Sequence, residues 1–520
     1  MRSTQKGDYL NPMSDLFQDY SEAAARSGAY DEMFAQGHVA RRSYGQVSGG
    51  ALRELSLADV TARADSMART FLDRGVTFDY AGEERPFPPL DIVPRVIPAD
   101  EWDVLERGVA QRVKALEAFL NDVYGRMAVV TDGVIPRQLV TTSAHFHRAV
   151  HGFEPSGGVR VHVSGIDVVR DAAGTFRVLE DNVRVPSGVS YVLENRRAMA
   201  KGLPEAFGQQ HIRPVEEYPR RLLSALRKTA PSGVDDPTVV VLTPGVFNSA
   251  YFEHTLLAGL MGVELVEGRD LICRGNRVYM RTTAGEQRVD VIYKRIDDDF
   301  LDPLQFRSDS MLGCRDWSTP PAPGGSDHRQ RCGQRRSDDK LVYSYVPDLI
   351  RYYLHEEPII ANVDTFRLEE KEAREHVLDR LDELVVKPVD GSGGKGLVIG
   401  PDATKDELDA LRKRVIADPP VDGSHSRSCS SPRCRHSPET SSAPPPRGPA
   451  SFRSQRRRRR LGPARRPHPG GAQGRVLDSE LQPRRRFQGH LGFGRFPATA
   501  GRSDSTPIRD GPRASIRVAG

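Results

Sequence analysis

Apolar positions recur at helical spacing between Asp100 and residue 123. Asp100 can cap the first turn, and one apolar stripe follows at three- and four-residue steps, formed by Trp102, Leu105, Val109, Val113, Leu116, Leu120 and Val123. Because this spacing places side chains on one face of a helix, the segment predicts a helix that packs on a core. Residues 71–96 instead carry four prolines, which exclude a helix interior and predict an extended segment.

A period-two pattern follows in two runs, residues 159–169 and 176–185. A cluster of turn residues, from Asp171 to Gly174, separates the two runs. Alternation of this kind is typical of half-buried strands, so the two runs predict an antiparallel hairpin.

Farther along, the pattern alternates between strand and helix. TVVVLT at 238–243 predicts a strand, AYFEHTLLAGLMG at 250–262 a helix, and VELVEG at 263–268 a second strand, which together form a βαβ unit. The apolar run VDVIYKRI at 289–296 predicts another strand that ends at Lys294 and Arg295. No G-x-G-x-x-G motif follows the first strand, so a dinucleotide fingerprint is absent.

The sharpest local motif is a strand, a glycine-rich loop and a second strand at residues 381–400. The first strand delivers Lys387 just before the loop Gly391, Ser392, Gly393, Gly394, Lys395 and Gly396. Glycines let backbone N–H groups turn toward phosphate oxygens, and the lysine adds a point charge. The spacing does not fit a Walker A loop. The competing interpretation is a hairpin turn beside a surface lysine.

A second candidate site lies on the predicted hairpin. Alternation places Glu180 and Asn182 on one face of their strand, where Asp167 of the neighbouring strand can join them. Two carboxylates and an amide are oxygen ligands suited to Mg²⁺, which keeps phosphate oxygens among its ligands. The alternative is a turn in which Asp181 and Asn182 bond their own backbone.

Composition limits the class of protein. With 520 residues, 38% hydrophobic and 28% charged, the chain has room for two to four domains and a sizeable core. Its five cysteines show neither a disulfide framework nor zinc-ligand spacing. No secretory h-region and no run of about 18 apolar residues is present. We therefore expect a cytoplasmic protein without a membrane span.

The net charge of +5 hides two unlike regions. Residues 421–520 contain 21 Arg, no Lys and 6 acidic residues, roughly +15, so the remainder is roughly −10. This Arg/Pro-rich tail has no sustained apolar period, and we expect it to be disordered. It is a nucleic-acid-binding arm, a solvated linker or an out-of-frame translation, and its lack of Lys favours the last. Residues 315–337 have the same texture.

Three motifs together resemble one known family. VLEDNVRVPSGVSY (178–191), VVKPVDGSGGKG (385–396) and VDVIYKRIDDDFLDPL (289–304) look like the circularly permuted ATP-grasp type 2 family, and more distantly like glutathionylspermidine synthetase and the glutathione synthetases. The resemblance covers residues 15–313 and 338–418. It implies an α+β fold in which the glycine loop follows the metal-binding strands.

The resemblance also implies an activity and a set of roles. ATP-grasp ligases use ATP and Mg²⁺ to convert a carboxylate into an acylphosphate, which an amine or thiol attacks; the substrates would be small molecules or peptides. Asp167, Glu180 and Asn182 would hold the metal, and Lys387 with the loop Gly391–Gly396 would bind phosphates. Arg184 would lie near the γ-phosphate. Lys294 and Arg295 are candidates for a carboxylate or phosphate, although a solvent-exposed pair at a strand end is an equal alternative.

The organisation implied is a helical segment (1–70), an ATP-grasp part with the metal-binding strands (71–230), a βαβ domain like a pre-ATP-grasp domain (231–313), an aberrant insert (314–337), a second, incomplete ATP-grasp part (338–419) and the tail (420–520). The insert and the tail depart from the family pattern, and frameshifts near 314, 337 and 420 would explain both. A chain lacking the end of the fold is expected to turn over ATP weakly or not at all.

One other function class competes with the ligase. The run Arg456–Arg460 could make the chain a non-catalytic nucleic-acid-binding protein, with non-specific, salt-sensitive affinity. The tail has no interleaved aromatics to stack on bases, so we expect nucleic acid to bind only non-specifically through the tail, if at all.

Overall fold

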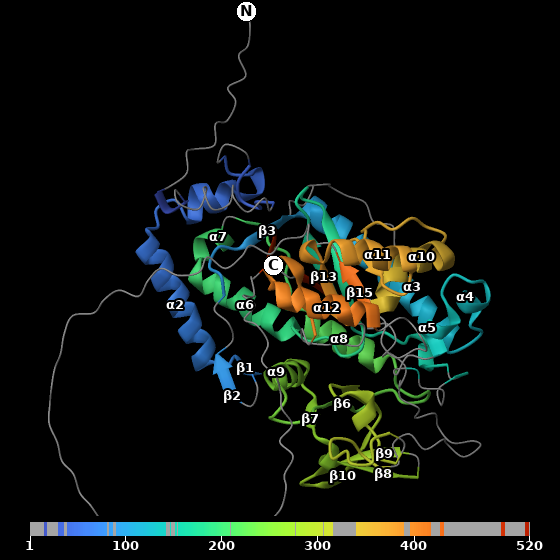
Figure 1. The fold of residues 1–520 in the computed structure, drawn as a ribbon. Helices are drawn as coiled ribbons and strands as arrows, with labels where there is room; N and C mark the ends of the chain where they lie inside the picture. Colours follow the sequence, from blue (N-terminus) through green and yellow to red (C-terminus); the bar gives the residue numbers. More distant parts are fainter. Residues whose placement is uncertain are drawn as a thin grey trace, which may run out of the picture.

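The computed structural model describes residues 15–17, 30–35, 39–80, 83–86, 90–141, 146, 151–152, 154–208, 210–275, 277–304, 306–315, 340–388, 396–417, 427–430, 490–493 and 515–518. The helices are α2 (Leu57–Asp73), α3 (Ala99–Val123), α4 (Ala128–Thr131), α5 (Arg137–Thr141), α6 (Val189–Gly202), α7 (Pro204–Gly208), α8 (Tyr218–Arg227), α9 (Tyr251–Met261), α10 (Lys340–Leu354), α11 (Lys371–Asp379) and α12 (Lys405–Ala417). Helices and strands both contribute, as expected for an α+β protein (Figure 1).

The strands form several small sheets. They are β1 (Thr77–Tyr80), β2 (Glu83–Pro86), β3 (Arg95–Pro98), β4 (Gly165–Arg170), β5 (Phe176–Asn182), β6 (Val239–Leu242), β7 (Glu264–Val266), β8 (Leu271–Arg274), β9 (Arg277–Thr282), β10 (Gly285–Val289), β11 (Val291–Lys294), β12 (Thr365–Arg367), β13 (Val385–Pro388), β14 (Val398–Ile399), β15 (Arg427–Ser430), β16 (His490–Phe493) and β17 (Ser515–Val518).

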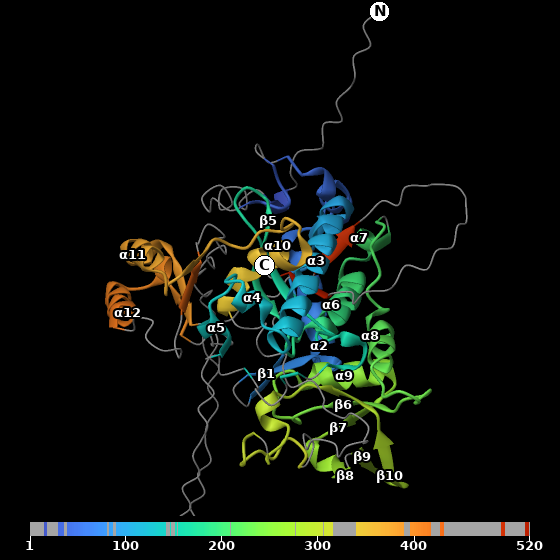
Figure 2. The same cartoon turned by 90° about the vertical axis from the view of Figure 1, so that its right-hand side faces the viewer.

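Helix α3 lies along the centre of the molecule, beside α10 (Figure 2). The stripe predicted from the sequence is its buried face, because Leu105, Val109, Leu116 and Leu120 are each at most 1% exposed. Toward the end of α3 this face packs on Val346 and Leu349 of α10, and nearer its start it packs on the sheet that contains β4 and β5. The helix therefore supports the predicted hairpin directly.

The predicted βαβ unit is present. Strand β6, helix α9 and strand β7 follow one another in the chain. Strand β6 pairs in parallel with both β7 and β11 to give the order β11-β6-β7. Helix α9 ends at Met261 and is capped by Gly262, whose φ of 69° is the left-handed conformation that a glycine adopts without strain. The antiparallel sheet β8-β9-β10 follows β7 in the chain.

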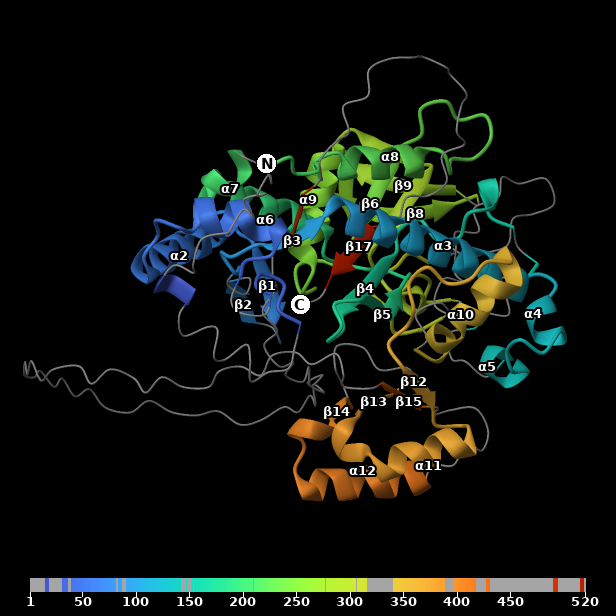
Figure 3. The same ribbon diagram turned by 90° about the horizontal axis from the view of Figure 1, so that it is seen from above.

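The glycine-loop strands belong to a separate layer. Figure 3 shows β12, β13, β14 and β15 with α11 and α12 on one side of them, apart from α3 and the hairpin. Val377, Val386, Leu411 and Val415 form the core of this layer. The two predicted strands are confirmed, since β13 and β14 pair antiparallel, whereas residues 389–395 of the loop between them lie outside the described residues.

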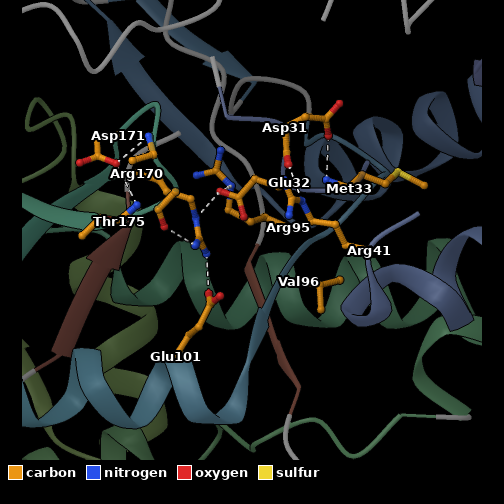
Figure 4. A network of polar contacts seen from close by, with 12 residues as sticks. Asp31, Glu32, Met33, Arg41, Arg95, Val96, Glu101, Arg170, Asp171 and Thr175 are labelled. Carbon is orange, nitrogen blue, oxygen red and sulfur yellow. Dashed lines mark hydrogen bonds and ion pairs between the residues drawn. The ribbon is translucent and has the colours of Figure 1, made fainter. Parts of the chain in front are cut away.

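The segment at residues 30–35 is held against β3 and β4 by the charged contacts of Glu32 (Figure 4). The Glu32 carboxylate lies 3.2 Å from Arg95 of β3 and 3.2 Å from Arg170 of β4. Arg170 also donates to Glu101 of α3 at 2.6 Å. These contacts fix the end of β4 that lies away from Asp167.

Some predictions fall on parts of the chain that the structure describes only partly. The extended segment at 71–96 begins later than expected, because α2 continues to Asp73 before β1 starts. Residues 316–339, almost the whole predicted insert, and Arg456–Arg460 lie outside the described residues. Of the tail, the structure describes only β15, β16 and β17, each paired with a strand of the preceding part. Within the described part of the chain, none of the helices combines the length and the apolar character needed to cross a membrane.

Candidate functional site

The hairpin β4–β5 places the predicted metal ligands opposite one another. Asp167 pairs with Glu180 in the register of the two strands, and Gly165 pairs with Asn182. The strands are shorter than the runs predicted, because residues 159–164 are not part of β4 and β5 ends at Asn182. The predicted turn is present, with the Gly174 amide donating to the Asp171 carbonyl at 2.9 Å.

A β-bulge shapes this part of the hairpin. Asp167 pairs with Glu180 whereas Val168 pairs with Val178, so Leu179 is an extra residue without a partner across the ladder. Val178 and Asp181 are consequently both buried, while Glu180 and Asn182 are half-buried. Simple alternation would have put residues 178, 180 and 182 on the same face, so it could not have predicted this arrangement.

The ladder register places Asp167 across from Glu180, two residues away from Asn182 along the hairpin. The Asn182 side-chain amide donates to Glu180 Oε1 at 3.2 Å, which shows that these two side chains meet. Two carboxylates and one amide oxygen suit Mg²⁺, and phosphate oxygens and water would complete its coordination shell. The described residues contain no group of three or more His, Cys, Asp or Glu arranged to hold a metal ion.

Two of the predicted basic site residues, Arg184 and Lys294, lie beside aspartates that follow β11. The Arg184 guanidinium is 3.6 Å from Asp297, and the Lys294 ammonium contacts the carboxylate of Asp298. The Lys294 and Asp298 side chains are 11% and 0% exposed. The chain after the hairpin and the end of β11 therefore face each other, and Lys294 is not the solvent-exposed residue of the alternative interpretation.

Arg295 differs from its sequence-based expectation as a substrate ligand. Its guanidinium is buried and donates to the Pro186 carbonyl at 2.9 Å and to Ser187 Oγ at 2.7 Å. It also donates to Glu253 at 3.1 Å and to the Tyr293 hydroxyl at 3.1 Å. These protein acceptors engage both terminal nitrogens, so the geometry favours a role in holding the turn at residues 186–188.

Glu253 is a residue of this region that the sequence did not indicate. It is buried in α9, and its carboxylate accepts from the backbone amides of Gly188 at 2.6 Å and Ser190 at 3.2 Å. It thereby caps the first turn of α6 from a distant part of the chain. An acidic residue in a mostly apolar helix was the signal available in the sequence, and it does not identify a partner.

Lys387 is half-buried in β13, between β14 and β15. Gly396 has a φ of 72°, a left-handed conformation in keeping with its place at the end of a glycine loop. Gly391, Ser392, Gly393, Gly394 and Lys395 lie outside the described residues. The phosphate-binding role of this loop stays a prediction.

Comparison with known proteins identifies relatives. Residues 94–422 match the model of a family described as a circularly permuted ATP-grasp. An uncharacterized protein of Mycobacterium tuberculosis is 55% identical over 407 residues, which are 78% of this chain and 73% of that protein. An uncharacterized protein of Synechocystis is 49% identical over 349 residues, 66% of this chain and 72% of that one.

Two further matches carry functional names. A protein of Frankia alni named a putative glutamate–cysteine ligase is 42% identical over 395 residues, 75% of this chain and 45% of that protein. Among solved structures, a glutathione synthetase-like effector of Globodera pallida in its apo form matches with a TM-score of 0.45 and 12% identity, over 73% of this chain and 82% of that chain.

Proposed function

Because the chain belongs to the circularly permuted ATP-grasp family, we propose that it is an ATP-dependent ligase that joins a carboxylate to an amine or thiol through an acylphosphate. The observation that carries the proposal is the register of the hairpin, in which Asp167 faces Glu180 and Asn182 contacts Glu180. A relative named a putative glutamate–cysteine ligase supports the same reaction class.

The hairpin side chains would hold Mg²⁺ bound to ATP. Asp167, Glu180 and Asn182 supply two negative charges and a neutral oxygen, which suits a hard divalent cation. When bound, the cation neutralises charge on the β- and γ-phosphates. The hairpin would thereby fix the position of the γ-phosphate relative to the basic side chains of Arg184 and Lys294 near the end of β11.

Arg184 and Lys294 would provide positive charge where the substrate carboxylate meets the γ-phosphate. Arg184 follows Asn182 by two residues and lies beside Asp297, so it connects the hairpin to the end of β11. A cation at this place would stabilise charge that develops during phosphoryl transfer. Lys294 would bind the carboxylate or a phosphate once it exchanges Asp298 for that anion.

Lys387 and the glycine loop would bind the α- and β-phosphates from the opposite layer. No protein nucleophile is required, because positioning and charge neutralisation supply most of the catalysis in phosphoryl transfer. The substrate carboxylate is the group that attacks the γ-phosphate. The side chains that line the substrate site, and not the fold, determine which carboxylate and which amine or thiol the protein accepts.

The reaction can be tested without knowing the amine. Purified full-length protein is incubated with ATP, Mg²⁺, hydroxylamine and a series of carboxylates that begins with glutamate, and both ADP and hydroxamate are measured. Hydroxylamine intercepts an acylphosphate, so hydroxamate should form in proportion to ADP. We expect Glu180→Ala and Lys387→Ala to lower the rate by about 100-fold or more, because they remove direct contacts rather than supporting ones.

Two exposed residues provide matched controls. Glu205→Ala and Lys371→Ala remove the same charges from surface positions, where the side chains are 47% and 79% exposed, and should leave the rate unchanged. ADP formation that persists in Glu180→Ala, or that yields no hydroxamate with any carboxylate, would contradict the proposed ligase.

A further inference from the structure

A buried ion pair lies directly behind the proposed metal ligands. Arg112 of α3 donates to both carboxylate oxygens of Asp181, at 2.6 Å and 2.7 Å. The two side chains are 2% and 0% exposed. Asp181 lies between Glu180 and Asn182 in the sequence. Its side chain is on the core face, where Arg112 binds it, whereas the side chains of Glu180 and Asn182 are on the opposite face.

The bulge in β5 is held on its other side by the backbone of Val178. The Val178 amide donates to the Ala361 carbonyl at 2.9 Å, and its carbonyl accepts from the Val363 amide at 2.8 Å. The Tyr343 hydroxyl donates to the same carbonyl at 2.7 Å. Leu179 and Glu180 are therefore confined between two anchored positions.

Asn362 joins these two anchors into one network. Its side-chain oxygen accepts from Arg112 at 2.7 Å, and its side-chain nitrogen donates to the Tyr343 carbonyl at 2.9 Å. Arg112, Asp181, Asn362 and Tyr343 thus form a continuous hydrogen-bonded chain around the bulge. The planar guanidinium suits this task because it binds a carboxylate through two parallel bonds and keeps a third donor for Asn362.

Stability alone does not account for such a pair. Removing two charges from water costs free energy that their attraction only partly returns, so apolar residues of similar size often stabilise a fold equally well. A bidentate, fully hydrogen-bonded pair does restrict geometry, however. A bulge is the part of a ladder that lacks regular pairing, and here it immediately precedes Glu180.

We propose that Arg112 and Asp181, linked through Asn362 to Tyr343, are positioning residues that set the orientation of Glu180 and Asn182 for the divalent cation. This inference rests on the proposed function, because it concerns the same cation. The network acts through the backbone of β5 and touches neither the cation nor a substrate. Residues that orient metal ligands in this way contribute strongly to metal affinity.

Manganese binding gives a direct readout that is independent of turnover. Mn²⁺ binding to the full-length protein is measured by electron paramagnetic resonance with a non-hydrolysable ATP analogue present, and the melting temperature is recorded in parallel. Asp181→Asn should weaken Mn²⁺ binding by about 10- to 100-fold. Arg112→Lys keeps the charge but loses the two-pronged contact, so it should retain intermediate affinity.

A double variant separates positioning from folding. Arg112→Met combined with Asp181→Leu replaces the pair with apolar side chains and leaves no buried charge unpaired, so it should melt near the wild-type temperature. We still expect it to bind Mn²⁺ about 10- to 100-fold more weakly. As a control, Glu101→Gln weakens the contact with Arg170 at the far end of β4 and should leave Mn²⁺ affinity unchanged.

The possible outcomes are distinct. Wild-type affinity for Mn²⁺ in a folded double variant, or an equal loss in Glu101→Gln, would overturn the positioning role while leaving the ligase proposal intact. If the wild-type protein binds no Mn²⁺ with the analogue, the proposed function fails and this inference fails with it.

Discussion

At the scale of single residues, His254 illustrates how burial changes chemistry. It is 1% exposed in α9, and its Nδ1 is 2.9 Å from Thr243 Oγ1. Burial, and then the positive charge of Arg295, lower the pKa of His254 to about 2. The imidazole is therefore neutral in the folded protein at any pH at which the protein would work, and it is a packing and hydrogen-bonding residue.

This environment predicts a pH dependence of stability. Between about pH 6.5 and pH 2 the unfolded chain protonates His254 while the folded chain does not, so stability is present above pH 6.5 and is lost as the pH falls. The loss should approach about 1.4 kcal/mol per pH unit below pH 6. His254→Gln should remove this part of the slope in urea unfolding measured from pH 7 to pH 4.5.

The control for this prediction is His211→Gln, which changes an exposed histidine and should leave the slope unchanged. If the free energy of unfolding falls equally steeply with decreasing pH in the wild type and in His254→Gln, His254 is not the source of the pH dependence.

At the scale of elements, one contact joins α6, α9 and β11. Glu253 of α9 caps α6 through the amides of Gly188 and Ser190 and pairs with Arg295 after β11. Gly188 has a φ of 127°, which side-chain-bearing residues rarely adopt, so the turn requires glycine at this position. The chain that leaves the hairpin β4–β5 is thus fixed to the βαβ unit by a carboxylate from outside the motif.

We expect this element junction to be sensitive to a single atom change. Glu253→Gln leaves the Arg295 charge buried without its counter-ion and should lower the free energy of unfolding by about 3 to 5 kcal/mol. Urea denaturation followed by circular dichroism measures this change. Glu264→Gln, at an exposed position of β7, serves as the control, and a loss below about 1 kcal/mol in Glu253→Gln would contradict the assignment.

At the scale of the whole molecule, the proposed site draws on two layers. The hairpin β4–β5 lies against α3, whereas Lys387 and the glycine loop belong to the layer of β12–β15 with α11 and α12 (Figure 3). Residues 361–363 contact Val178 of the hairpin and lead into β12, so they link the two layers. ATP bound between these layers would contact both.

The composition of the chain leads to a prediction about its gene. The family match ends at residue 422, close to the position near 420 where Arg and Pro become abundant and Lys disappears. We propose that the reading frame shifts near codons 314, 337 and 420. Resequencing the DNA and translating all three frames across codons 310–340 and beyond 418 should recover apolar strands and a glycine-bearing turn.

The same prediction has a biochemical arm. A protein expressed from the proposed restored frame should turn over ATP faster than the chain described here, because strands encoded in that frame would complete the nucleotide pocket. A confirmed reading frame that encodes residues 315–337 and 421–520 as they stand would contradict the prediction.

Much of the fold could be predicted because the signals are local. The stripe on α3, the βαβ unit and the strands around the glycine loop depend on periods of 3.6 and 2 and on turn residues, all of which lie within short windows of sequence. The motif around Glu180 also placed the chain in its family. The hairpin itself follows from alternation and a short turn, but regular pairing from that turn would place Asp167 opposite Leu179, and the bulge shifts the register so that Asp167 pairs with Glu180.

By itself, then, the sequence determined the elements, the family and the candidate ligands Asp167, Glu180 and Asn182. Only the tertiary structure decided how those ligands are held. The bulge at Leu179, the Arg112–Asp181 pair and the Glu253–Arg295 contact join residues 42 to 69 positions apart or depend on such contacts. Buried charges find partners through the packing of whole elements, and no local pattern specifies which partner that will be.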